Sequence, residues 1–429
     1  MTHVLVAIGS MGDLRPQLAL ARALRAEGAD VLLLGLEDYA PLAADSGVPF
    51  RDVGTRLMGP VSPPLLARAA RGSQTIGALL VRRWLHDSAG AIARALARAV
   101  HPGDHLVTGI LGLAACRLLA RRRGCRLTEL ALAPTLPTAF ADSLVGAPRA
   151  GRSRINAAYS RAVRRGSVTM GLPIARALDR SGAGEPVGAA GRGEGGETGG
   201  IIVACSPRLV PRAPDWPTGT RCTGHLVLET PEWRPPPSLL RFLDSGEPPV
   251  YVGFGSVPVR DPAGEVARWA EAARRAGTRA LLYPAAGFTD WDRDYGEHVH
   301  LVRFAPHDWL LPRTAAAVHH GGAGTTHGAL AAGVPQGVIP FSLDQPYPRS
   351  FIVWLGGVGR RRCRCCGVDC GMGVRGFAAR GGARWSVSGG PGVRGRPQGR
   401  GRATGRAGSG GGRCPGAGGG SRGGRPCSG

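Results

Sequence analysis

The chain has 429 residues, of which 43% are hydrophobic, and a formal net charge of +24. This length is sufficient for two ordinary domains with sizeable cores. No apolar stretch reaches the length of a membrane span, and no basic segment precedes the first apolar run. We therefore expect a cytoplasmic protein without a secretory signal or stable membrane insertion.

The positive charge is concentrated at the C-terminal end. Residues 359–429 contain 15 Arg and one acidic residue, Asp369, so this segment carries +14 of the +24 and leaves +10 for the rest. All the basic residues are Arg and none is Lys, which indicates a GC-biased gene rather than selection for phosphate contacts. We therefore expect no nucleic-acid partner, and a basic nucleic-acid binder is an alternative that only the tail favours.

Residues 1–206 alternate apolar runs with helical patterns, which predicts an N-terminal Rossmann-like domain. The expected strands are 2–8, 31–34, 50–53, 104–110, 126–132 and, as the last, 201–205. The expected helices are 14–27, 38–47, 62–100 and 113–123. Residues 134–159 are less regular and are interpreted as ligand-binding loops, and residues 181–200 as a mobile loop.

Asp13 ends the turn Gly9-Ser10-Met11-Gly12-Asp13 that follows the first predicted strand. One interpretation is a helix N-cap, a position that Asp favours. The other is a general base at the carboxyl end of the strand. A carboxylate in water is a weak base, so the site would have to desolvate Asp13 or hold the substrate hydroxyl in very good position.

The proline-punctuated residues 207–249 are predicted to be an interdomain linker, and residues 250–358 a second Rossmann-like domain. Its expected elements are a strand at 250–256, a helix at 263–276, strands at 280–283, 299–304 and 315–318, and a helix at 327–333. The fold class is therefore α/β, with two Rossmann-like domains that face a cleft.

The stretch His319-His320-Gly321-Gly322-Ala323-Gly324-Thr325-Thr326 lies between a predicted strand and a predicted helix. Such a turn directs free backbone N–H groups and the positive helix end at one point, where phosphate binds. Glycines let the backbone approach the anion, while the imidazole of His320 and the hydroxyl of Thr325 add donors. Taken alone, the pattern also fits a plain strand–turn–helix connection.

Residues 334–341 form a second buried apolar run, which delivers Asp344 and Gln345 at its carboxyl end. Ligands bind at this end of parallel strands. A carboxylate and an amide beside a phosphate cradle suit the hydroxyl groups of a sugar.

Together, His-His-Gly-Gly-Ala-Gly-Thr-Thr and Pro-Phe-Ser-Leu-Asp-Gln-Pro resemble the donor-binding half of nucleotide-sugar-dependent glycosyltransferases of the GT-B architecture. The sterol glucosyltransferases and the enzymes that glycosylate macrolide and glycopeptide antibiotics are similar over residues 1–358. The resemblance implies that Asp13 is the general base. It also implies a donor site made of Ser256, Phe304, His307, His320, Gly322, Gly324, Thr325, Asp344 and Gln345. Trp309 is interpreted as core packing.

The resemblance further implies inverting transfer of a hexose from a UDP- or dTDP-sugar to a hydroxyl of a lipophilic small molecule. The partners would be the nucleotide-sugar donor and this acceptor. We expect no cofactor and no metal, because backbone and side-chain donors would stabilise the diphosphate instead. The alternative is a truncated, catalytically impaired relative that only binds nucleotide or acceptor.

Residues 359–429 break the pattern, because they contain no Leu or Ile after Arg360 and are dominated by Gly and Arg. Such a composition predicts disorder. The cysteines at 363, 365, 366 and 370 lack the paired spacing of common zinc sites. The Arg/Gly pattern resembles RNA-binding segments, but no stacking aromatic residues are interleaved beyond Trp385. The preferred interpretation is out-of-frame translation that begins between residues 347 and 360.

Overall fold

The computed structural model describes residues 1–57, 74–144, 146–182, 198–230, 233–255, 261–285 and 287–339. All of them belong to one compact unit, Met1–Arg380. Three predicted site residues, Ser256, Asp344 and Gln345, lie outside the described residues, as does the predicted tail.

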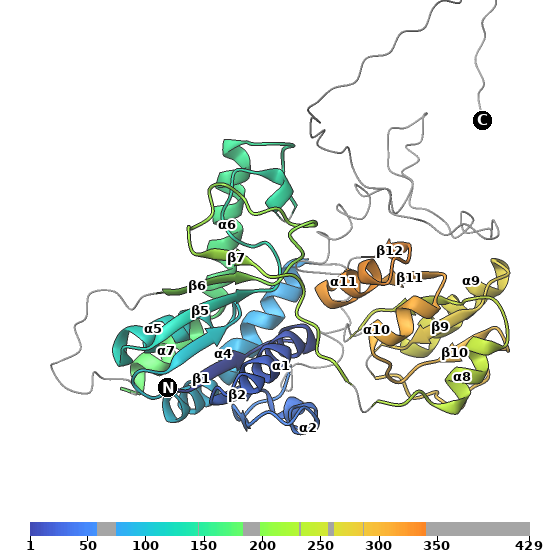
Figure 1. The fold of residues 1–429 in the computed structure, drawn as a ribbon, viewed down its shortest axis with the longest axis horizontal. Helices are drawn as coiled ribbons and strands as arrows, with labels where there is room; N and C mark the ends of the chain where they lie inside the picture. Colours follow the sequence, from blue (N-terminus) through green and yellow to red (C-terminus); the bar gives the residue numbers. More distant parts are fainter. Residues whose placement is uncertain are drawn as a thin grey trace, which may run out of the picture. The chain divides into compact units, whose positions relative to one another are not determined.

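The first sheet contains seven strands in the order β3-β2-β1-β4-β5-β6-β7, coloured blue to green in Figure 1. Every neighbouring pair is parallel. The strands are β1 (His3–Ala7), β2 (Val31–Gly35), β3 (Phe50–Asp52), β4 (His105–Thr108), β5 (Arg126–Ala131), β6 (Thr198–Val203) and β7 (Thr220–Cys222). Most of their apolar residues are buried, as in a parallel sheet covered by helices.

The helices in this part of the chain have clear local determinants. They are α1 (Met11–Ala26), α2 (Ala40–Asp45), α4 (Gln74–Ala99), α5 (Leu113–Arg123), α6 (Arg154–Met170) and α7 (Leu172–Arg180). Helix α1 starts at the N-cap Ser10 and buries Leu14, Leu18 and Ala21 against the sheet, at helical spacing. Helix α5 ends at Gly124, whose φ of 64° is left-handed.

The second sheet contains five parallel strands in the order β10-β9-β8-β11-β12. Its strands are β8 (Val250–Gly253), β9 (Ala280–Tyr283), β10 (Val299–Leu301), β11 (Ala316–His319) and β12 (Gln336–Val338). The helices are α8 (Pro237–Asp244), α9 (Pro262–Arg275), α10 (His307–Leu310) and α11 (Ala323–Ala331), coloured yellow to orange in Figure 1. Two apolar clusters pack around this sheet.

The predicted α/β class with two Rossmann-like sheets is confirmed, and three local predictions are wrong. The run 201–205 is not the last strand of its sheet, because β7 pairs with β6 from within the segment predicted as linker, which also contains α8. The last part of 134–159 is helical, because α6 begins at Arg154 after the N-cap Ser153. Helix α11 begins at Ala323 rather than at His327.

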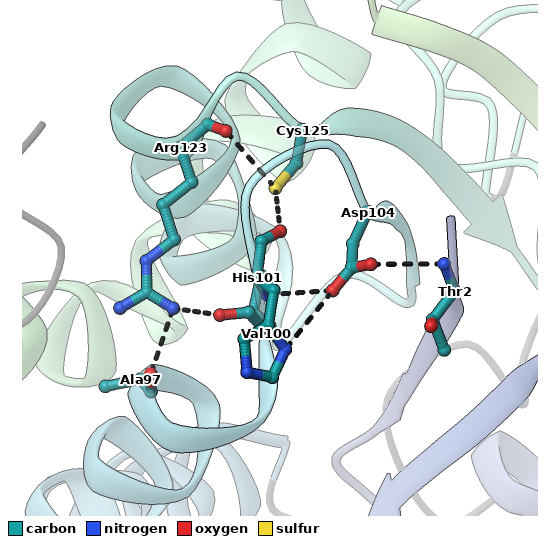
Figure 2. Close-up of polar contacts among 7 residues, drawn as sticks. All are labelled: Thr2, Ala97, Val100, His101, Asp104, Arg123 and Cys125. Carbon is teal, nitrogen blue, oxygen red and sulfur yellow. Dashed lines mark hydrogen bonds and ion pairs between the residues drawn. The ribbon is translucent and has the colours of Figure 1, made fainter. Parts of the chain in front are cut away.

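The amino edge of the first sheet is held by a network of polar contacts, shown in Figure 2. The carboxylate of Asp104 accepts hydrogen bonds from the backbone N–H of Thr2 (3.1 Å) and of His101 (2.8 Å). The Arg123 guanidinium donates to Ala97 O (2.9 Å) and to Val100 O, which satisfies carbonyls at the end of α4. Thr2, Asp104 and Arg123 lie just before the starts of β1, β4 and β5, so these contacts stabilise the amino ends of the strands.

A buried ion pair joins α6 to the middle of β5. Glu129 is 4% exposed, and both of its oxygens accept hydrogen bonds from the guanidinium of Arg164. Arg117 lies 3.9 Å from the same carboxylate. Because both charges have left water, removal of one partner would leave the other uncompensated.

We predict that Glu129→Ala lowers the free energy of unfolding by about 3–5 kcal/mol, the cost of an unpaired buried charge. Urea unfolding would measure it. Glu271→Ala is the matched control, because Glu271 pairs with Arg274 and Arg275 on the exposed face of α9 and should matter little. An equal effect of the two substitutions would contradict the assignment.

Candidate functional site

Each sheet has one point where the strand order reverses. In the second sheet this switch point lies between β8 and β11, and in the first it lies between β1 and β4. Ligands of open parallel sheets bind outside the carboxyl ends of the strands at this point. The stretch that follows β11 and the loop that holds Asp13 therefore occupy the two expected positions.

The N-terminus of α11 presents free donors at the second switch point. Gly322 is its N-cap and has no side-chain capping bond, and the first intrahelical bond that follows is from Thr326 N to Gly322 O (3.0 Å). The N–H groups of Ala323, Gly324 and Thr325 consequently have no partner within the helix. Gly324 and Thr325 belong to the first helical turn rather than to the preceding loop, which improves their alignment with the helix dipole.

The His320 ring fills the space between the two strand ends. A Cβ on Gly255, which follows β8, would lie 2.9 Å from His320 Cε1, and a Cβ on Gly322 would lie 2.4 Å from His320 Nε2. His320 Nδ1 is buried and has no hydrogen-bond partner among the residues that the structure describes. Burial lowers the pKa of His320, which its backbone hydrogen bond with Gly253 partly opposes. The ring is therefore a neutral group with one unused nitrogen.

His319 is completely buried behind this cradle. Its Nδ1 lies 3.1 Å from Gly321 N, which donates to it, and its Nε2 lies 2.8 Å from Gln336 Oε1. Gln336 Nε2 in turn donates to Thr326 O (3.3 Å). The three contacts connect β11, the glycine turn, β12 and α11.

His307 is the first residue of the short helix α10 and lies close enough to His320 to be influenced by it, and Phe304 precedes this helix by three residues. Phe304 is 42% exposed, and the Arg15 guanidinium carbon is 5.8 Å from the centre of its ring. His307 Nε2 lies 3.4 Å from the hydroxyl of Tyr251, and burial lowers the pKa of His307 to about 4. An exposed aromatic ring and a neutral imidazole can form one side of a nucleobase subsite. Trp309 packs instead against Trp233, as predicted (5.0 Å between rings).

Asp13 lies at the first switch point but is not the N-cap of α1. Ser10 is the cap, and Asp13 is the third helical residue of a capping box: its Oδ2 accepts from Ser10 N (2.8 Å) and Ser10 Oγ (3.2 Å). The N-cap interpretation of Asp13 is therefore wrong, although Asp13 does support the helix start. A Cβ on Gly109, after β4, would lie 3.9 Å from Asp13 Oδ1, so this oxygen is directed toward the strand ends.

Sequence reasoning missed several residues of this region. Arg15 follows Asp13 by two positions, is half-buried, and lies close enough to Asp308 and Tyr283 for both to influence it. His225 stacks on His327 of α11 with 4.7 Å between ring centres. His327 Nδ1 donates to Ala323 O (2.7 Å), and Ser206 N donates to His327 Nε2 (3.4 Å). Neither histidine stands in a sequence motif, so no local signal could have identified them.

The structure therefore brings together His307, His320, Gly322, Gly324 and Thr325 around the second switch point, while the only contact that it gives for Phe304 among the described residues is with Arg15 of α1. Among the described residues, no group of three or more His, Cys, Asp or Glu could hold a metal ion. In the same residues no helix is long and apolar enough to cross a membrane.

Comparison with known proteins yields matches of three kinds. Residues 292–359 match the family described as erythromycin biosynthesis protein CIII-like, C-terminal domain. The vancomycin aglycone glucosyltransferase of Amycolatopsis orientalis is 31% identical over 374 residues, which cover 83% of this chain and 84% of that protein.

A sterol 3-beta-glucosyltransferase of Arabidopsis thaliana is 38% identical over 143 residues, 33% of this chain, but these span only 22% of that longer protein. The crystal structure of the glycosyltransferase VinC in complex with dTDP has a TM-score of 0.54 at 18% identity, and the match covers 83% of this chain and 85% of that one. At this identity the structural likeness establishes the fold alone.

We predict that Gly322→Ala weakens the binding of a nucleoside diphosphate as much as His320→Ala does. The new Cβ would displace the His320 ring, from which it would be 2.4 Å away, whereas the backbone φ of −64° suits alanine. Loss of one hydrogen bond to a charged group costs about 1.5–3 kcal/mol. Calorimetry with UDP and dTDP would measure both variants.

Gly324→Ala is the matched control, because its Cβ would meet only His225 Nε2, at 3.9 Å. It should retain affinity. If Gly324→Ala and Gly322→Ala lose affinity equally, the His320 ring does not contribute to the binding site.

We also predict that stability falls as the pH drops from about 6.5 toward 4. Burial lowers the pKa of His225, His307 and His319, each to about 4, whereas an unfolded histidine titrates near 6.5. Between these values the unfolded chain binds more protons, so protonation favours unfolding, by on the order of 2 kcal/mol per group at pH 4.5. Urea unfolding at several pH values would measure the slope, and His225→Asn should reduce it. An unchanged slope would show that His225 titrates normally.

Proposed function

Because the chain belongs to the UDP-glycosyltransferase-like family of GT-B glycosyltransferases, we propose that it transfers a hexose from a nucleoside-diphosphate sugar to a small-molecule hydroxyl. The observation that carries the proposal is the position of His320 and the free α11 N–H groups at one switch point, with Asp13 at the other. The donor would be a UDP- or dTDP-sugar, and the acceptor a lipophilic natural product such as a sterol, a macrolide or a similar compound. The names of the relatives support this choice.

On the donor side, the backbone N–H groups of Ala323, Gly324 and Thr325 would bind the diphosphate, and the imidazole of His320 would donate as well once the diphosphate charge has led to protonation of its second nitrogen. Gly322 keeps this ring in place. Phe304 and His307 would line the nucleobase subsite. Ser256 would contact a phosphate, and Asp344 and Gln345 would bind sugar hydroxyls, although these three lie outside the described residues. The backbone N–H groups and the Ser256 hydroxyl are neutral dipoles, and as groups already oriented before the reaction they would stabilise the phosphates without reorganisation.

On the acceptor side, Asp13 would remove the proton of the attacking hydroxyl. The hydroxyl oxygen then forms a bond to the anomeric carbon on the face opposite the diphosphate, so the configuration inverts. The bond from the anomeric carbon to the phosphate oxygen breaks, and its electron pair leaves with the nucleoside diphosphate. The hydrogen bond from Ser10 N orients the carboxylate for this step.

Turnover with purified protein tests the proposal. UDP-glucose and dTDP-glucose would be offered with a sterol, a macrolide aglycone and a glycopeptide aglycone, and products would be identified by mass spectrometry and by the anomeric coupling in NMR. A β-linked product from an α-linked donor is expected. Binding of nucleotide without transfer to any acceptor would favour a binding-only protein.

For the base, we predict that Asp13→Asn lowers kcat by about 10²–10⁴, the usual contribution of a general base. The amide oxygen can still accept from Ser10 N, so Tm should hardly move. Steady-state kinetics and thermal unfolding would be measured on the same preparation.

Ser10→Ala is the control with the opposite signature. It removes the cap of α1 and should cost about 1 kcal/mol of stability, but it leaves the Asp13 carboxylate in place. A variant pair in which Asp13→Asn keeps its rate and loses stability would assign Asp13 a structural role only.

A further inference from the structure

The buried histidine beside the cradle, His319, has both ring nitrogens in hydrogen bonds. Gly321 N donates to Nδ1 (3.1 Å), and Nε2 lies 2.8 Å from Gln336 Oε1. Gln336 is itself buried, and its amide nitrogen donates to Thr326 O (3.3 Å). Since that nitrogen is identified by its acceptor, the other end of the amide must be the oxygen.

These contacts admit a single protonation state of the ring. Because Nδ1 accepts, it carries a lone pair, and because Gln336 presents an oxygen, Nε2 must carry the hydrogen. The imidazole is therefore neutral with its proton on Nε2. Burial, which lowers the pKa of His319 to about 4, favours the same neutral form.

The partner at Nδ1 is the residue that turns the chain toward the ligand. Gly321 has a φ of 89° and is buried, so its N–H would be costly to leave unpaired. His319 satisfies this N–H from within the protein. The direction of the next N–H groups, at Ala323, Gly324 and Thr325, depends on where the Gly321 turn is held.

We propose that His319 is a positioning residue for the anion cradle, which holds the Gly321 turn through Nδ1 while Gln336 locks the proton on Nε2. The proposal rests on the proposed function, because it concerns the same diphosphate site. His319 does not touch the ligand in this account. It acts through Gly321, whereas the neighbouring His320 acts on the ligand directly.

A bland alternative is that His319 only fills the core between β11 and β12. If His319 only fills the core, the effect of a substitution depends on side-chain volume alone, and replacements of similar size should behave alike. If His319 positions the turn, the effect of a substitution depends on which of the two ring nitrogens the new side chain replaces. Asparagine places an oxygen at the position of Nδ1, and glutamine places its amide at the position of Nε2.

The test compares His319→Asn with His319→Gln, with UDP and dTDP as probes in calorimetry. His319→Asn retains the acceptor for Gly321 N–H and should bind within about threefold of the unmodified chain. His319→Gln retains the reach to Gln336 but lacks that acceptor, and it should bind about tenfold more weakly or worse. Equal losses, or equal retention, would overturn the proposal.

Two measurements keep the test decisive if a variant folds poorly or if no nucleotide binds. Long-range ¹H–¹⁵N spectra of the ¹⁵N-histidine-labelled chain should show His319 with a protonated Nε2 and an unprotonated Nδ1. The His319 signal is assigned as the one that His319→Asn removes. If that variant folds poorly, the signal is assigned by backbone connectivity. A protonated Nδ1 would refute the proposal whatever the ligand. Amide exchange at Gly321 should be slow in the unmodified chain and in His319→Asn, and fast in His319→Gln. Slow exchange in a folded His319→Gln would also refute it.

If the amide and tautomer results hold and the chain binds neither UDP nor dTDP, the proposed function fails while the positioning of the turn stands. If nucleotide binds normally and both replacements behave alike, the positioning role fails while the proposed function stands.

Discussion

Under the proposed function, diphosphate binding depends on the backbone N–H groups at the start of α11, which have no partner within the helix. The chain contains no lysine, so a diphosphate at this position would be met by peptide dipoles, hydroxyls, imidazoles or arginines. Peptide N–H groups bind only if the turn before them is held in one conformation. Three features fit this requirement: a Cβ on Gly322 would collide with the His320 ring, Gly255 adjoins the same ring, and a buried histidine is hydrogen-bonded to Gly321.

The two sheets use the same topology for different chemistry. In each sheet, the strand order reverses between two neighbouring strands, β1 and β4 in the first sheet and β8 and β11 in the second, and this position is the switch point. In the first sheet this point holds a carboxylate, Asp13, within a capping box, and in the second it holds donors. The opposite edge of the first sheet is occupied by Asp104 and Arg123, which satisfy strand starts and helix ends (Figure 2). The proposed proton acceptor, Asp13, and the proposed anion site thus both lie at the carboxyl ends of strands, as the proposed transfer requires.

The strands that are apolar on both faces could be predicted, because a parallel strand covered on both sides appears in the sequence as a continuous apolar run. Strand β9 and helix α5 were predicted at their observed bounds, and His320 was placed correctly beside the glycine turn. Strand β7 was missed because Thr220–Cys222 is short and lies among prolines, so only its pairing with β6 makes it a strand. The start of α11 was placed four residues late, because the glycine-rich residues before His327 were interpreted as a turn. Arg15, His225 and Gln336 were not identified because they act through contacts with residues distant in sequence.

The histidines show how such a cradle can work without a permanent cation in its inner wall. Burial lowers the pKa of His307, His319 and His320, so at neutral pH these rings are dipoles rather than charges. Under the proposed function, fixed dipoles stabilise the negative charge that develops on the departing diphosphate and need no reorganisation as it forms. A fixed positive charge would also stabilise the donor before reaction, and binding substrate and transition state equally does not accelerate the chemical step. Under the same proposal, N–H groups held by a fixed turn supply this stabilisation, and the tautomer of His319 contributes by holding the turn at Gly321.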